Sequence, residues 1–398
     1  MVLRMDLDIL KRGFEEIIPE DEFDKRVGSR LRVKFGADPT GADLHLGHAV
    51  ILNKLRQFQD AGHTVVFIIG DFTARIGDPS GRDETRPPLS EEEVNANAHT
   101  YREQVFNILD EKKTEVVYNN EWFSKMGTTD VLKLASRYTV ARMLERDDFS
   151  KRYEQNVPIR IHEFMYPLLQ GWDSVEVESD LELGGTDQKF NLLVGRSFQK
   201  EEGQAPQLIG TLPILPGTDG EKKMSKSYNN HIPLKSSPQD MYGKLMSIPD
   251  KLVKPYAELL TDLTQDFLEG IVDDAETLLD PKKNKKQVAY AIVSRFKGKS
   301  AAEAGQDYFE RTVEQGQAPE VDEMDDLPVA EEEIWIVDLL DKSGLVESRG
   351  EAKRLLKQGA VYLDGERLEG FDHDIRLDKP TVLRVGKHRF CRLIPAEG

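Results

Sequence analysis

The stretch that decides the fold of this 398-residue chain is Phe35-Gly36-Ala37-Asp38-Pro39-Thr40-Gly41-Ala42-Asp43-Leu44-His45-Leu46-Gly47-His48. Residues 31–35, which lead into it, alternate in polarity and predict a strand. Residues 49–60 space their apolar side chains three and four apart and predict a helix. The turn between them is rich in glycine and proline and places His45 and His48 at the helix entrance. A strand, turn and helix in this order expose backbone N–H groups to an anion.

Apolar runs further along extend this unit into a parallel sheet. Gly62–Gly70 is a continuous apolar run bounded by glycines, which indicates a strand buried on both faces. It completes a strand–helix–strand unit, for which a right-handed crossover is expected. Further strands are predicted at 115–118, 175–183 and 211–216, and further helices at 129–145, 159–172 and 190–198. The predicted fold class is therefore α/β, with a Rossmann-like parallel sheet in the first domain.

The length suits two or three domains, and shifts in composition suggest where they meet. Residues 1 to about 30 resemble a helical lead-in, and 249–316 is helical in pattern. Residues 320–333 hold eight acidic and no basic side chains and read as a linker, whereas 349–392 holds eleven basic and seven acidic ones. Two helices, 334–343 and 349–358, and a hairpin over 361–368 with an Asp364-Gly365 turn are expected beyond the linker. The predicted parts are a catalytic domain at 1–247, an α-helical domain at 248–319, a linker at 320–333 and a small α+β domain at 334–398.

Composition excludes several classes of protein. No apolar run approaches the roughly 20 residues that a membrane-spanning helix needs, so no membrane partner is expected. The single cysteine, Cys391, excludes an intrachain disulfide and a cysteine-built metal cluster, and it reads as a small core residue. We therefore expect an unprocessed cytoplasmic protein. The net charge of −18 argues against nonspecific binding of nucleic acid by the whole surface.

His45-Leu-Gly-His48 has three interpretations. Two histidines three apart share a helix face, so metal ligation must be considered, although a zinc site needs a third ligand that the sequence does not supply. Alternatively, both imidazoles and the helix N-terminus face a phosphate, and Gly47 leaves room for a flat ring. A purely structural role is the third interpretation.

Lys222-Lys-Met-Ser-Lys-Ser227 is the second motif that could carry chemistry. Lysines in such a loop are either a solvated charge run or a mobile cover that neutralises charge on a polyphosphate. The pattern GxxxxGK[ST] of Walker-type nucleotidases is absent from the chain. Taken together, the two motifs resemble the paired HxGH and KMSKS signature of class I aminoacyl-tRNA synthetases.

A third set of residues narrows the resemblance. Tyr166, Gln170 and Asp173 are spaced to share one helix face, which could also be a polar outer stripe interrupted by Pro167. With Gly184-Gly-Thr-Asp-Gln188 and Gly77-Asp-Pro-Ser-Gly81, they resemble the bacterial-type tyrosyl-tRNA synthetases. The resemblance extends over nearly the whole chain and implies a homodimer that binds L-tyrosine, ATP and tRNA(Tyr).

The resemblance also implies a role for each matching residue. Asp173 would accept the hydrogen bond of the tyrosine hydroxyl group, and Gln188 would lie near the carboxylate. The other implied tyrosine ligands are Gly36, Asp78, Tyr166 and Gln170. The implied ATP-binding residues are Asp38, Gly47, His48, Gly185, Asp187 and Lys226. The implied catalytic residues, which contact the γ-phosphate or the leaving pyrophosphate, are Thr40, His45, His48, Arg82, Arg86, Lys223 and Lys226. ATP would enter as a substrate with its Mg²⁺, with no tightly bound cofactor and no dedicated metal site.

Lys34 departs from the family pattern, because many bacterial relatives have a tyrosine there that donates a second hydrogen bond to the substrate. Lys34 either replaces that donor in the tyrosine site, pairs with an acid, or points away. Ile51 also replaces a polar residue of some relatives, with a local effect expected.

The C-terminal residues 348–365 resemble the S4 RNA-binding domain. The alternative is an amphipathic surface helix without RNA. The residues implied to bind RNA are Arg349, Lys353, Arg354 and Lys357, which offer cations to a phosphate backbone. Three other functions compete with tyrosine activation: a tryptophanyl-tRNA synthetase, a catalytically idle RNA-binding relative, and another HxGH nucleotidyltransferase.

Overall fold

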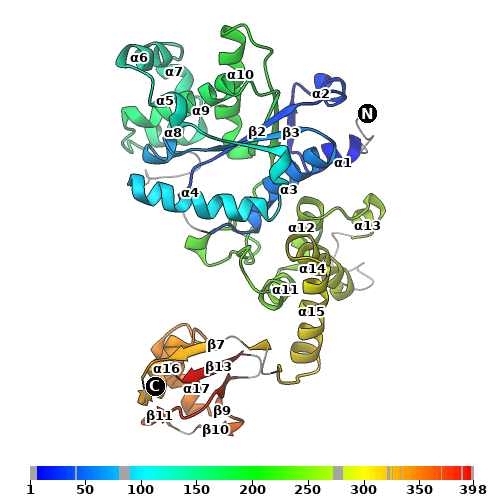
Figure 1. Cartoon of the computed structure of the whole chain (residues 1–398), viewed down its shortest axis with the longest axis vertical. Helices are drawn as coiled ribbons and strands as arrows, with labels where there is room; N and C mark the ends of the chain where they lie inside the picture. The colour runs from blue at the N-terminus through cyan, green and yellow to red at the C-terminus, as the bar shows by residue number, and fades with distance from the viewer. Residues whose placement is uncertain are drawn as a thin grey trace. The chain divides into compact units, whose positions relative to one another are not determined.

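The structure is a computed structural model that describes residues 7–40, 43–79, 90–271, 281–320, 323–324, 326–331, 333–368, 370–386 and 389–395. The chain divides into two compact units, Met1–Ala302 and Glu303–Gly398 (Figure 1). Each unit has its own sheet and its own core, and each is described separately below.

The first unit is built on a sheet that, within the described residues, has six strands in the order β1-β6-β5-β2-β3-β4. The strands from β6 to β4 run parallel, and β1 pairs antiparallel with β6 at the edge. The strands are β1 (Glu16–Ile18), β2 (Arg32–Ala37), β3 (Thr64–Ile69), β4 (Thr114–Tyr118), β5 (Leu181–Gly185) and β6 (Leu208–Leu212). The parallel α/β sheet predicted from the sequence is confirmed.

Helices cover both faces of this sheet. In Figure 1, α3 (Leu46–Asp60) lies below it, and α9 (Ile161–Glu176) and α10 (Lys189–Glu201) lie above it. All six residues of β3 are buried, as expected for a central parallel strand covered on both faces. α9 and α10 approach closely at Gly171, which has no side chain. A Cβ there would lie only 2.6 Å from Val194 Cγ1.

The order of the strands creates a crevice. From β2 the chain moves to β3 and β4 on one side, and it later returns to β5 and β6 on the other side of β2. The loops that follow β2 and β5 therefore diverge at the carboxyl ends of neighbouring strands. Open α/β sheets bind ligands at such a switch point. Thus the topology places the opening Phe35–His48 stretch beside Gly184–Gln188.

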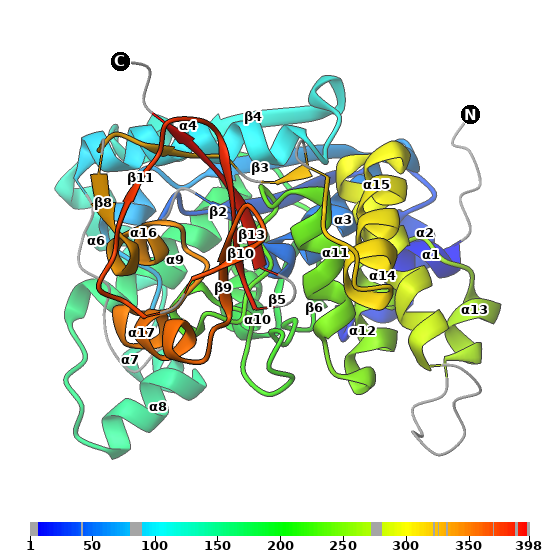
Figure 2. The same cartoon turned by 90° about the horizontal axis from the view of Figure 1, so that it is seen from below.

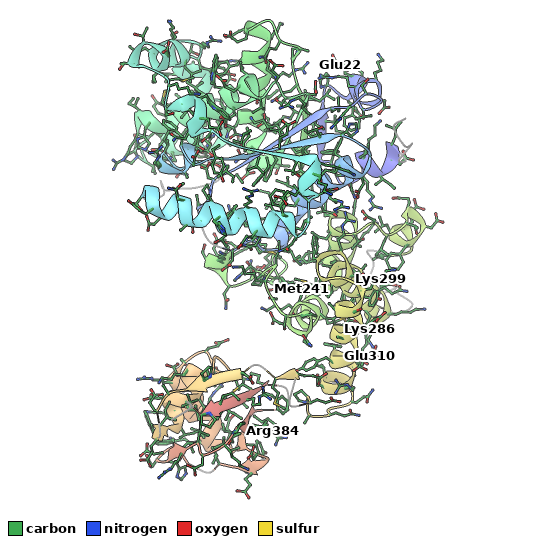
Figure 3. All side chains as sticks on the ribbon, in the orientation of Figure 1. Glu22, Met241, Lys286, Lys299, Glu310 and Arg384 are labelled. Atoms are coloured by element: carbon green, nitrogen blue, oxygen red, sulfur yellow. The ribbon has the colours of Figure 1, made fainter. Side chains whose placement is uncertain are left out.

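The remaining helices of this unit form two groups. One group precedes β6 in the chain and the other follows it; in Figures 1 and 2, α11, α12 and α14 of the second group lie together. Lys286 lies on α14 (Figure 3), and its carbonyl accepts a hydrogen bond of 3.4 Å from the hydroxyl of Tyr242 on α11. The helices are α1 (Leu7–Lys11), α2 (Glu20–Arg26), α4 (Glu91–Phe106), α5 (Asn120–Phe123), α6 (Thr128–Ser136), α7 (Val140–Met143), α8 (Asp147–Glu154), α11 (Pro238–Ser247), α12 (Val253–Leu260), α13 (Gln265–Gly270), α14 (Pro281–Lys297) and α15 (Lys299–Phe309), which continues past the boundary between the units.

The second unit is α+β. Its described residues form a five-stranded sheet in the order β10-β9-β12-β13-β7 and a pair of strands, β11 and β8. The elements are β7 (Asp326–Val329), β8 (Glu333–Trp335), α16 (Ile336–Lys342), α17 (Arg349–Lys357), β9 (Val361–Leu363), β10 (Glu366–Arg367), β11 (Asp374–Arg376), β12 (Thr381–Val385) and β13 (Arg389–Pro395). The hairpin expected at the Asp364-Gly365 turn is confirmed by the antiparallel pairing of β9 with β10.

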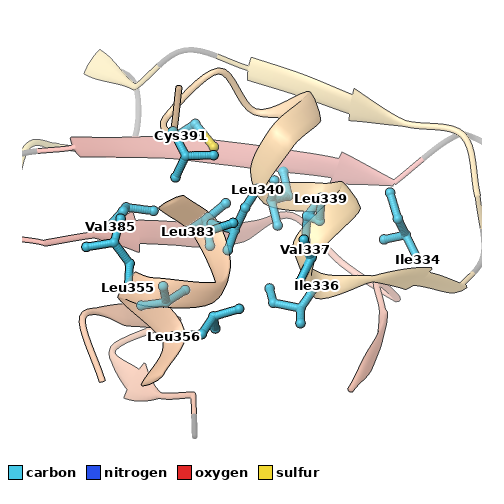
Figure 4. Packing of buried hydrophobic residues seen from close by; sticks show 14 of the residues in the cluster. Ile334, Ile336, Val337, Leu339, Leu340, Leu355, Leu356, Leu383, Val385 and Cys391 are labelled. Carbon is cyan, nitrogen blue, oxygen red and sulfur yellow. The ribbon is translucent and has the colours of Figure 1, made fainter. Parts of the chain in front are cut away.

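Apolar side chains from the helices and the sheet form the core of the second unit. Leu339 and Leu340 of α16 and Leu355 of α17 lie against Leu383 of β12 (Figure 4). Cys391 is buried in this core, as predicted. Arg384 lies on β12 (Figure 3). Its guanidinium lies 3.7 Å from the centre of the Tyr362 ring.

Several predicted boundaries were wrong. The lead-in is not wholly helical, because β1 forms a strand between α1 and α2 by pairing with β6. The 175–183 strand starts only at Leu181, since α9 continues to Glu176, and the 211–216 strand is β6, which ends at Leu212. Residues 129–145 form two helices, α6 and α7, and α16 begins at Ile336 because Ile334 pairs with Ile375. Non-local strand pairing decides the boundaries at β1 and at the start of α16.

Candidate active site

A cavity of about 350 Å³ lies at the carboxyl ends of β2 and β5. It collects most of the predicted site residues: Gly36, Asp38, Thr40, His45, Gly47, His48, Asp78, Tyr166, Gln170, Asp173, Gly185, Asp187, Gln188 and Lys223. Lys34 and Lys226 are not among its lining residues. Arg82 and Arg86 lie outside the described residues. The structure therefore brings residues from distant parts of the chain to one crevice.

The two histidines cap the first turn of α3. His45 is the N-cap residue, and its Nδ1 accepts a hydrogen bond of 3.1 Å from the Gly47 N–H. His48 Nδ1 accepts one of 3.3 Å from the His45 N–H, which completes a reciprocal capping box. Because each Nδ1 is an acceptor, a neutral ring carries its proton on Nε2. The two rings, 4.0 Å apart at their centres, can thus both present N–H donors.

His45 is held in the neutral form. Burial, followed by the nearby His48, His231 and Lys226, lowers its pKa from 6.5 to about 2. Gly47 is required in the first turn of α3, because a Cβ there would lie 2.9 Å from His45 Cε1 and Nδ1. The helix entrance consequently carries a neutral His45 imidazole with its proton on Nε2.

The Lys222–Ser227 loop reaches the same place. The Gly47 N–H lies 3.2 Å from Met224 Sδ, and the Met224 N–H donates a 2.9 Å hydrogen bond to the Leu215 carbonyl. The side chain of Asn230 supports the loop by accepting from the Ser225 N–H at 2.8 Å and donating to the Lys223 carbonyl at 3.1 Å. Buried Met224 therefore fastens the loop to the helix entrance, and the exposed lysines stay outside the packing.

A buried carboxylate, that of Asp173, also lines the cavity. Asp173 on α9 accepts a 2.9 Å hydrogen bond from Trp122 Nε1 and a 3.5 Å one from Asn119 Nδ2. Burial raises its pKa from 3.8 to about 7, an increase that Lys34 and these two hydrogen bonds oppose and Glu182 adds to. The cavity lining therefore includes a carboxyl group that can accept a hydrogen bond from a ligand when ionised.

Other polar side chains also line the cavity. The Tyr166 hydroxyl donates to Asp38 Oδ2 at 3.0 Å, and Thr73 Oγ1 donates to Asp38 Oδ1 at 2.7 Å. Burial, with the neighbouring Asp38 and Asp78, raises the pKa of Tyr166, so it stays a neutral donor. Gly70 must lack a side chain here, since a Cβ would lie 2.1 Å from Asp38 Oδ1.

A second chain of amides orders another part of the cavity lining. Gln188 Nε2 donates to Asp78 Oδ2 at 2.9 Å, and Asn191 Nδ2 donates to Gln188 Oε1 at 3.0 Å and to Gln170 Oε1 at 2.9 Å. Burial also raises the pKa of Asp187 nearby. This places Asp78, Gln170 and Gln188 in one hydrogen-bonded group.

Sequence reasoning missed four residues that orient the site: Thr73, Asn119, Trp122 and Asn191. Asn119 follows β4 at the carboxyl edge of the sheet, a position that could have signalled it. Asn191 is buried on α10, one turn after Gln188. Nothing in the local pattern sets Trp122 apart from a packing residue.

Lys34 pairs with an acid, which was one of the three alternatives. Its side chain is fully buried, and its Nζ lies 2.8 Å from Glu182 Oε1. The same ammonium group donates to Ser174 Oγ at 2.7 Å and to the Gln170 carbonyl at 2.9 Å.

In the second unit, the four residues predicted to bind RNA lie on α17. Lys353, Arg354 and Lys357 line a shallow hollow with Gly350 and Gln358. Arg349 lies to one side of it, where it pairs with Asp338 at 3.1 Å and with Asp341 at 3.4 Å.

The described residues offer neither a metal-binding cluster nor a membrane-spanning helix. There, no group of three or more His, Cys, Asp or Glu side chains is arranged to hold a metal ion. No helix of the described chain is long and apolar enough to cross a membrane.

The fold is that of a class I tRNA synthetase. Residues 25–314 match the family described as "tRNA synthetases class I (W and Y)", and residues 316–393 match a "Tyrosine--tRNA ligase SYY-like C-terminal domain". The tyrosine--tRNA ligase of Thermotoga maritima is 53% identical, over 98% of this chain and 97% of that protein. That of Oleidesulfovibrio alaskensis is 52% identical, over 99% of this chain and 100% of that protein. The chain belongs to the tyrosine--tRNA ligase family, of the bacterial type.

Solved structures agree on the fold. A C-terminally truncated mitochondrial tyrosyl-tRNA synthetase of Aspergillus nidulans has a TM-score of 0.64 at 23% identity, covering 77% of this chain and 92% of that one. The tyrosyl-tRNA synthetase of Archaeoglobus fulgidus, complexed with L-tyrosine, has a TM-score of 0.59 at 23% identity, covering 75% and 98%.

Proposed function

We propose that the protein joins L-tyrosine to ATP in the cavity and then transfers tyrosine to tRNA(Tyr). The tyrosine carboxylate attacks the α-phosphorus, and the bond to the β-phosphate breaks, so that tyrosyl-adenylate and pyrophosphate form. A ribose hydroxyl at the 3′ end of the tRNA then attacks the activated carbonyl, and AMP leaves. The observation that carries the proposal is the convergence of the α3 entrance, the Met224 loop and buried Asp173 on one cavity.

In this proposal, the substrate tyrosine lies along the wall that ends at Asp173. The Asp173 carboxylate accepts the phenolic hydrogen bond, and Asp78, Tyr166 and Gln170 hold the ammonium group. Gln188 lies near the carboxylate, with Gly36 lining the site. The hydrogen bonds between Gln188 and Asp78, 2.9 Å, and between Tyr166 and Asp38, 3.0 Å, support a preorganised arrangement.

ATP is proposed to lie across the entrance of α3. Gly47, Gly185 and Asp187 line the adenosine site with Asp38, while Thr40, His45 and His48 face the triphosphate. Neutral His45 can donate from Nε2 without adding a buried charge. Lys223, Lys226, Arg82 and Arg86 stabilise the charge that develops on the leaving pyrophosphate, which arrives and departs with Mg²⁺ as part of the substrate.

This division of labour suits the chemistry. Phosphoryl attack by a carboxylate needs little covalent participation by the protein, so positioning and charge stabilisation dominate the rate. Rejection of phenylalanine requires a buried group that loses its partner when the hydroxyl is missing. Tyrosyl-tRNA synthetases are a known case of such discrimination, and Asp173 is the proposed group here.

The test is ATP–pyrophosphate exchange by the purified full chain with single amino acids. We expect exchange that depends on tyrosine, followed by charging of tRNA(Tyr). Exchange with tryptophan and not with tyrosine would assign the protein to the sibling activity. Binding of tRNA without exchange for any amino acid would instead identify a catalytically idle relative.

Partners and location complete the proposal. The α17 cations Arg349, Lys353, Arg354 and Lys357 are proposed to bind tRNA, whose structured regions are read by shape and backbone. A homodimer is supported by apolar side chains exposed on α6 to α9: Leu132 at 65%, Val140 at 62%, Tyr153 at 67% and Ile161 at 79%. A single cysteine supports a reducing, cytoplasmic setting. The predicted domain ranges 1–247, 248–319, 320–333 and 334–398 remain a proposal.

A further inference from the structure

Lys34 lies in the sheet directly below the helix that carries the proposed tyrosine ligands. In the parallel register of β2 with β5, Lys34 is the partner of Glu182. Both side chains are almost completely inaccessible, at 0% and 1% exposure, and their charges are 2.8 Å apart. A buried ion pair is retained only where each remaining polar atom is satisfied.

Three oxygen atoms of the protein surround the Lys34 ammonium group. Nζ donates hydrogen bonds to Ser174 Oγ at 2.7 Å and to the Gln170 carbonyl at 2.9 Å, and Glu182 Oε1 lies 2.8 Å away as its ion-pair partner. An ammonium group has three donors and no acceptor. Because Lys34 is also fully buried and does not line the cavity, it is not placed to donate to a substrate hydroxyl group.

Glu182 is saturated as well. Its Oε2 accepts from Ser174 Oγ at 3.0 Å and from Gln207 Nε2 at 2.5 Å, and Gln207 is itself oriented by Ser179 and by the Gln199 side chain. Gly195 on α10 leaves room for this network because it has no side chain. A Cβ there would lie 2.6 Å from Ser174 Oγ. The network thus fixes the position of the Lys34 ammonium group from all sides.

The two residues of α9 that Lys34 contacts lie before and after Asp173 in the sequence. The Gln170 carbonyl and the Ser174 hydroxyl lie on the two sides of Asp173 along the helix. We propose that Lys34 is a positioning residue for tyrosine recognition: held by Glu182, it fixes the turn of α9 that carries Gln170 and Asp173, and it does not bond to the substrate hydroxyl. This inference rests on the proposed tyrosine site.

The charge of Lys34 has a second effect on the same turn. After burial, which raises the pKa of Asp173, Lys34 is the largest influence on that pKa and the largest that lowers it. The other groups that face Asp173 from the surrounding elements are Glu182 on β5, Tyr166 on α9, Trp122 on α5 and Asn119 after β4. Removal of Lys34 alone would leave Glu182 uncompensated and move ionisation of Asp173 to higher pH.

The test compares Lys34→Met, Glu182→Gln and the double variant in tyrosine-dependent pyrophosphate exchange between pH 5.5 and 9. Breaking a buried pair is far more disruptive than removing both charges. We expect Lys34→Met to raise the KM for tyrosine about 10- to 100-fold at pH 7, with the KM for ATP within about 2-fold. The KM of this variant for tyrosine should fall as Asp173 ionises, and this fall should occur at a higher pH than in the wild type. The double variant should recover at least about 5-fold of the loss, because neither partner is then left charged.

If Lys34 instead donated a hydrogen bond to the substrate hydroxyl group, the double variant would not recover tyrosine binding. A double variant that loses as much as Lys34→Met overturns the proposal, and so does a Lys34→Met variant that keeps the wild-type KM for tyrosine. If Lys34→Met does not fold, Ser174→Ala decides: it keeps the ion pair and should still raise the KM for tyrosine about 2- to 5-fold. A KM unchanged in Ser174→Ala would then overturn the proposal.

Lys54→Met is the matched control. Lys54 is also buried in the first unit, where it donates to the carbonyls of Ile9, Leu10 and Arg12. Its loss should lower stability without changing the KM for tyrosine. Wild-type exchange is measured first: no tyrosine-dependent exchange would refute the proposed function itself, whereas a wild-type enzyme with unaltered variants would refute only the role of Lys34.

Discussion

Replacement of Asp173 by asparagine should stabilise the protein and impair its proposed function at the same time. Asp173 is buried at 4% exposure, and burial raises its pKa from 3.8 to about 7. The folded state therefore holds this proton more tightly than the unfolded chain does. Below about pH 4, where the side chain is protonated in both the folded and the unfolded state, the carboxyl group does not destabilise the fold. Above about pH 7, where it is ionised in both states, its destabilising effect is complete.

The magnitude can be worked from the contacts. About three pH units separate the two pKa values, which corresponds to roughly 4 kcal/mol at about 1.4 kcal/mol per unit. The asparagine keeps the 2.9 Å bond from Trp122 but loses the 3.5 Å bond from Asn119, which subtracts about 1 kcal/mol. Lys34 stays compensated by Glu182. We expect Asp173→Asn to be more stable by roughly 2–4 kcal/mol at pH 8 and nearly equal to wild type at pH 4.

Urea unfolding at pH 4, 6, 7 and 8, followed by tryptophan fluorescence, measures this difference, since Trp122 contacts the site. Exchange assays on the same samples should show that preference for tyrosine over phenylalanine falls roughly 10- to 100-fold, the loss of a hydrogen bond to a charged acceptor. A stability difference that is the same at every pH would refute the assignment of the raised pKa to Asp173. Unchanged discrimination would refute its recognition role.

Three further changes test the ATP and RNA sites. Lys226→Ala should slow adenylate formation about 100-fold and alter tyrosine binding less than 3-fold, measured by rapid kinetics, since the lysine is proposed to act on the departing pyrophosphate. Gly47→Ala should reduce kcat/KM for ATP at least about 10-fold in the exchange assay, because its Cβ would lie 2.9 Å from the His45 ring. Arg354→Ala should raise the KM for tRNA about 3- to 10-fold in charging assays and leave exchange unchanged.

Controls separate these effects from general damage. Lys222→Ala removes a charge from the same loop and should have less effect on adenylate formation than Lys226→Ala; equal losses would argue against a specific transition-state contact. Gly243→Ala is the control for Gly47→Ala. Gly243 lies in α11, where a new Cβ would have no other part of the protein within 4 Å, so the change should stabilise the protein by about 0.5–1 kcal/mol. Arg376→Ala removes another exposed charge of the second unit, at 71% exposure, and equal effects on tRNA would contradict a site on α17.

The local pattern was enough for the framework of the site. The strand, turn and helix around Phe35–His48 follow from apolar spacing and turn residues, and β3 follows from a continuous apolar run. The Asp364-Gly365 hairpin has a turn chemistry that works over a few residues. The cavity also collects most of the residues that were carried over from the family motifs. Each of these inferences depends on residues that are close in sequence or on motif positions.

Only the tertiary structure decided what surrounds these residues. Asn119 and Trp122 reach Asp173 from elsewhere in the sequence, and Lys34 meets Glu182 because β2 and β5 pair in one particular parallel register. Pairing with β6 likewise turned part of a helical-looking lead-in into β1. A strand's neighbours and register depend on the packing of the whole sheet, and no local pattern contains them. The sequence by itself therefore determined most of the side chains that line the cavity, whereas tertiary packing determined which groups orient them, and that Lys34 is bound to Glu182, Ser174 and Gln170 and not exposed to the cavity.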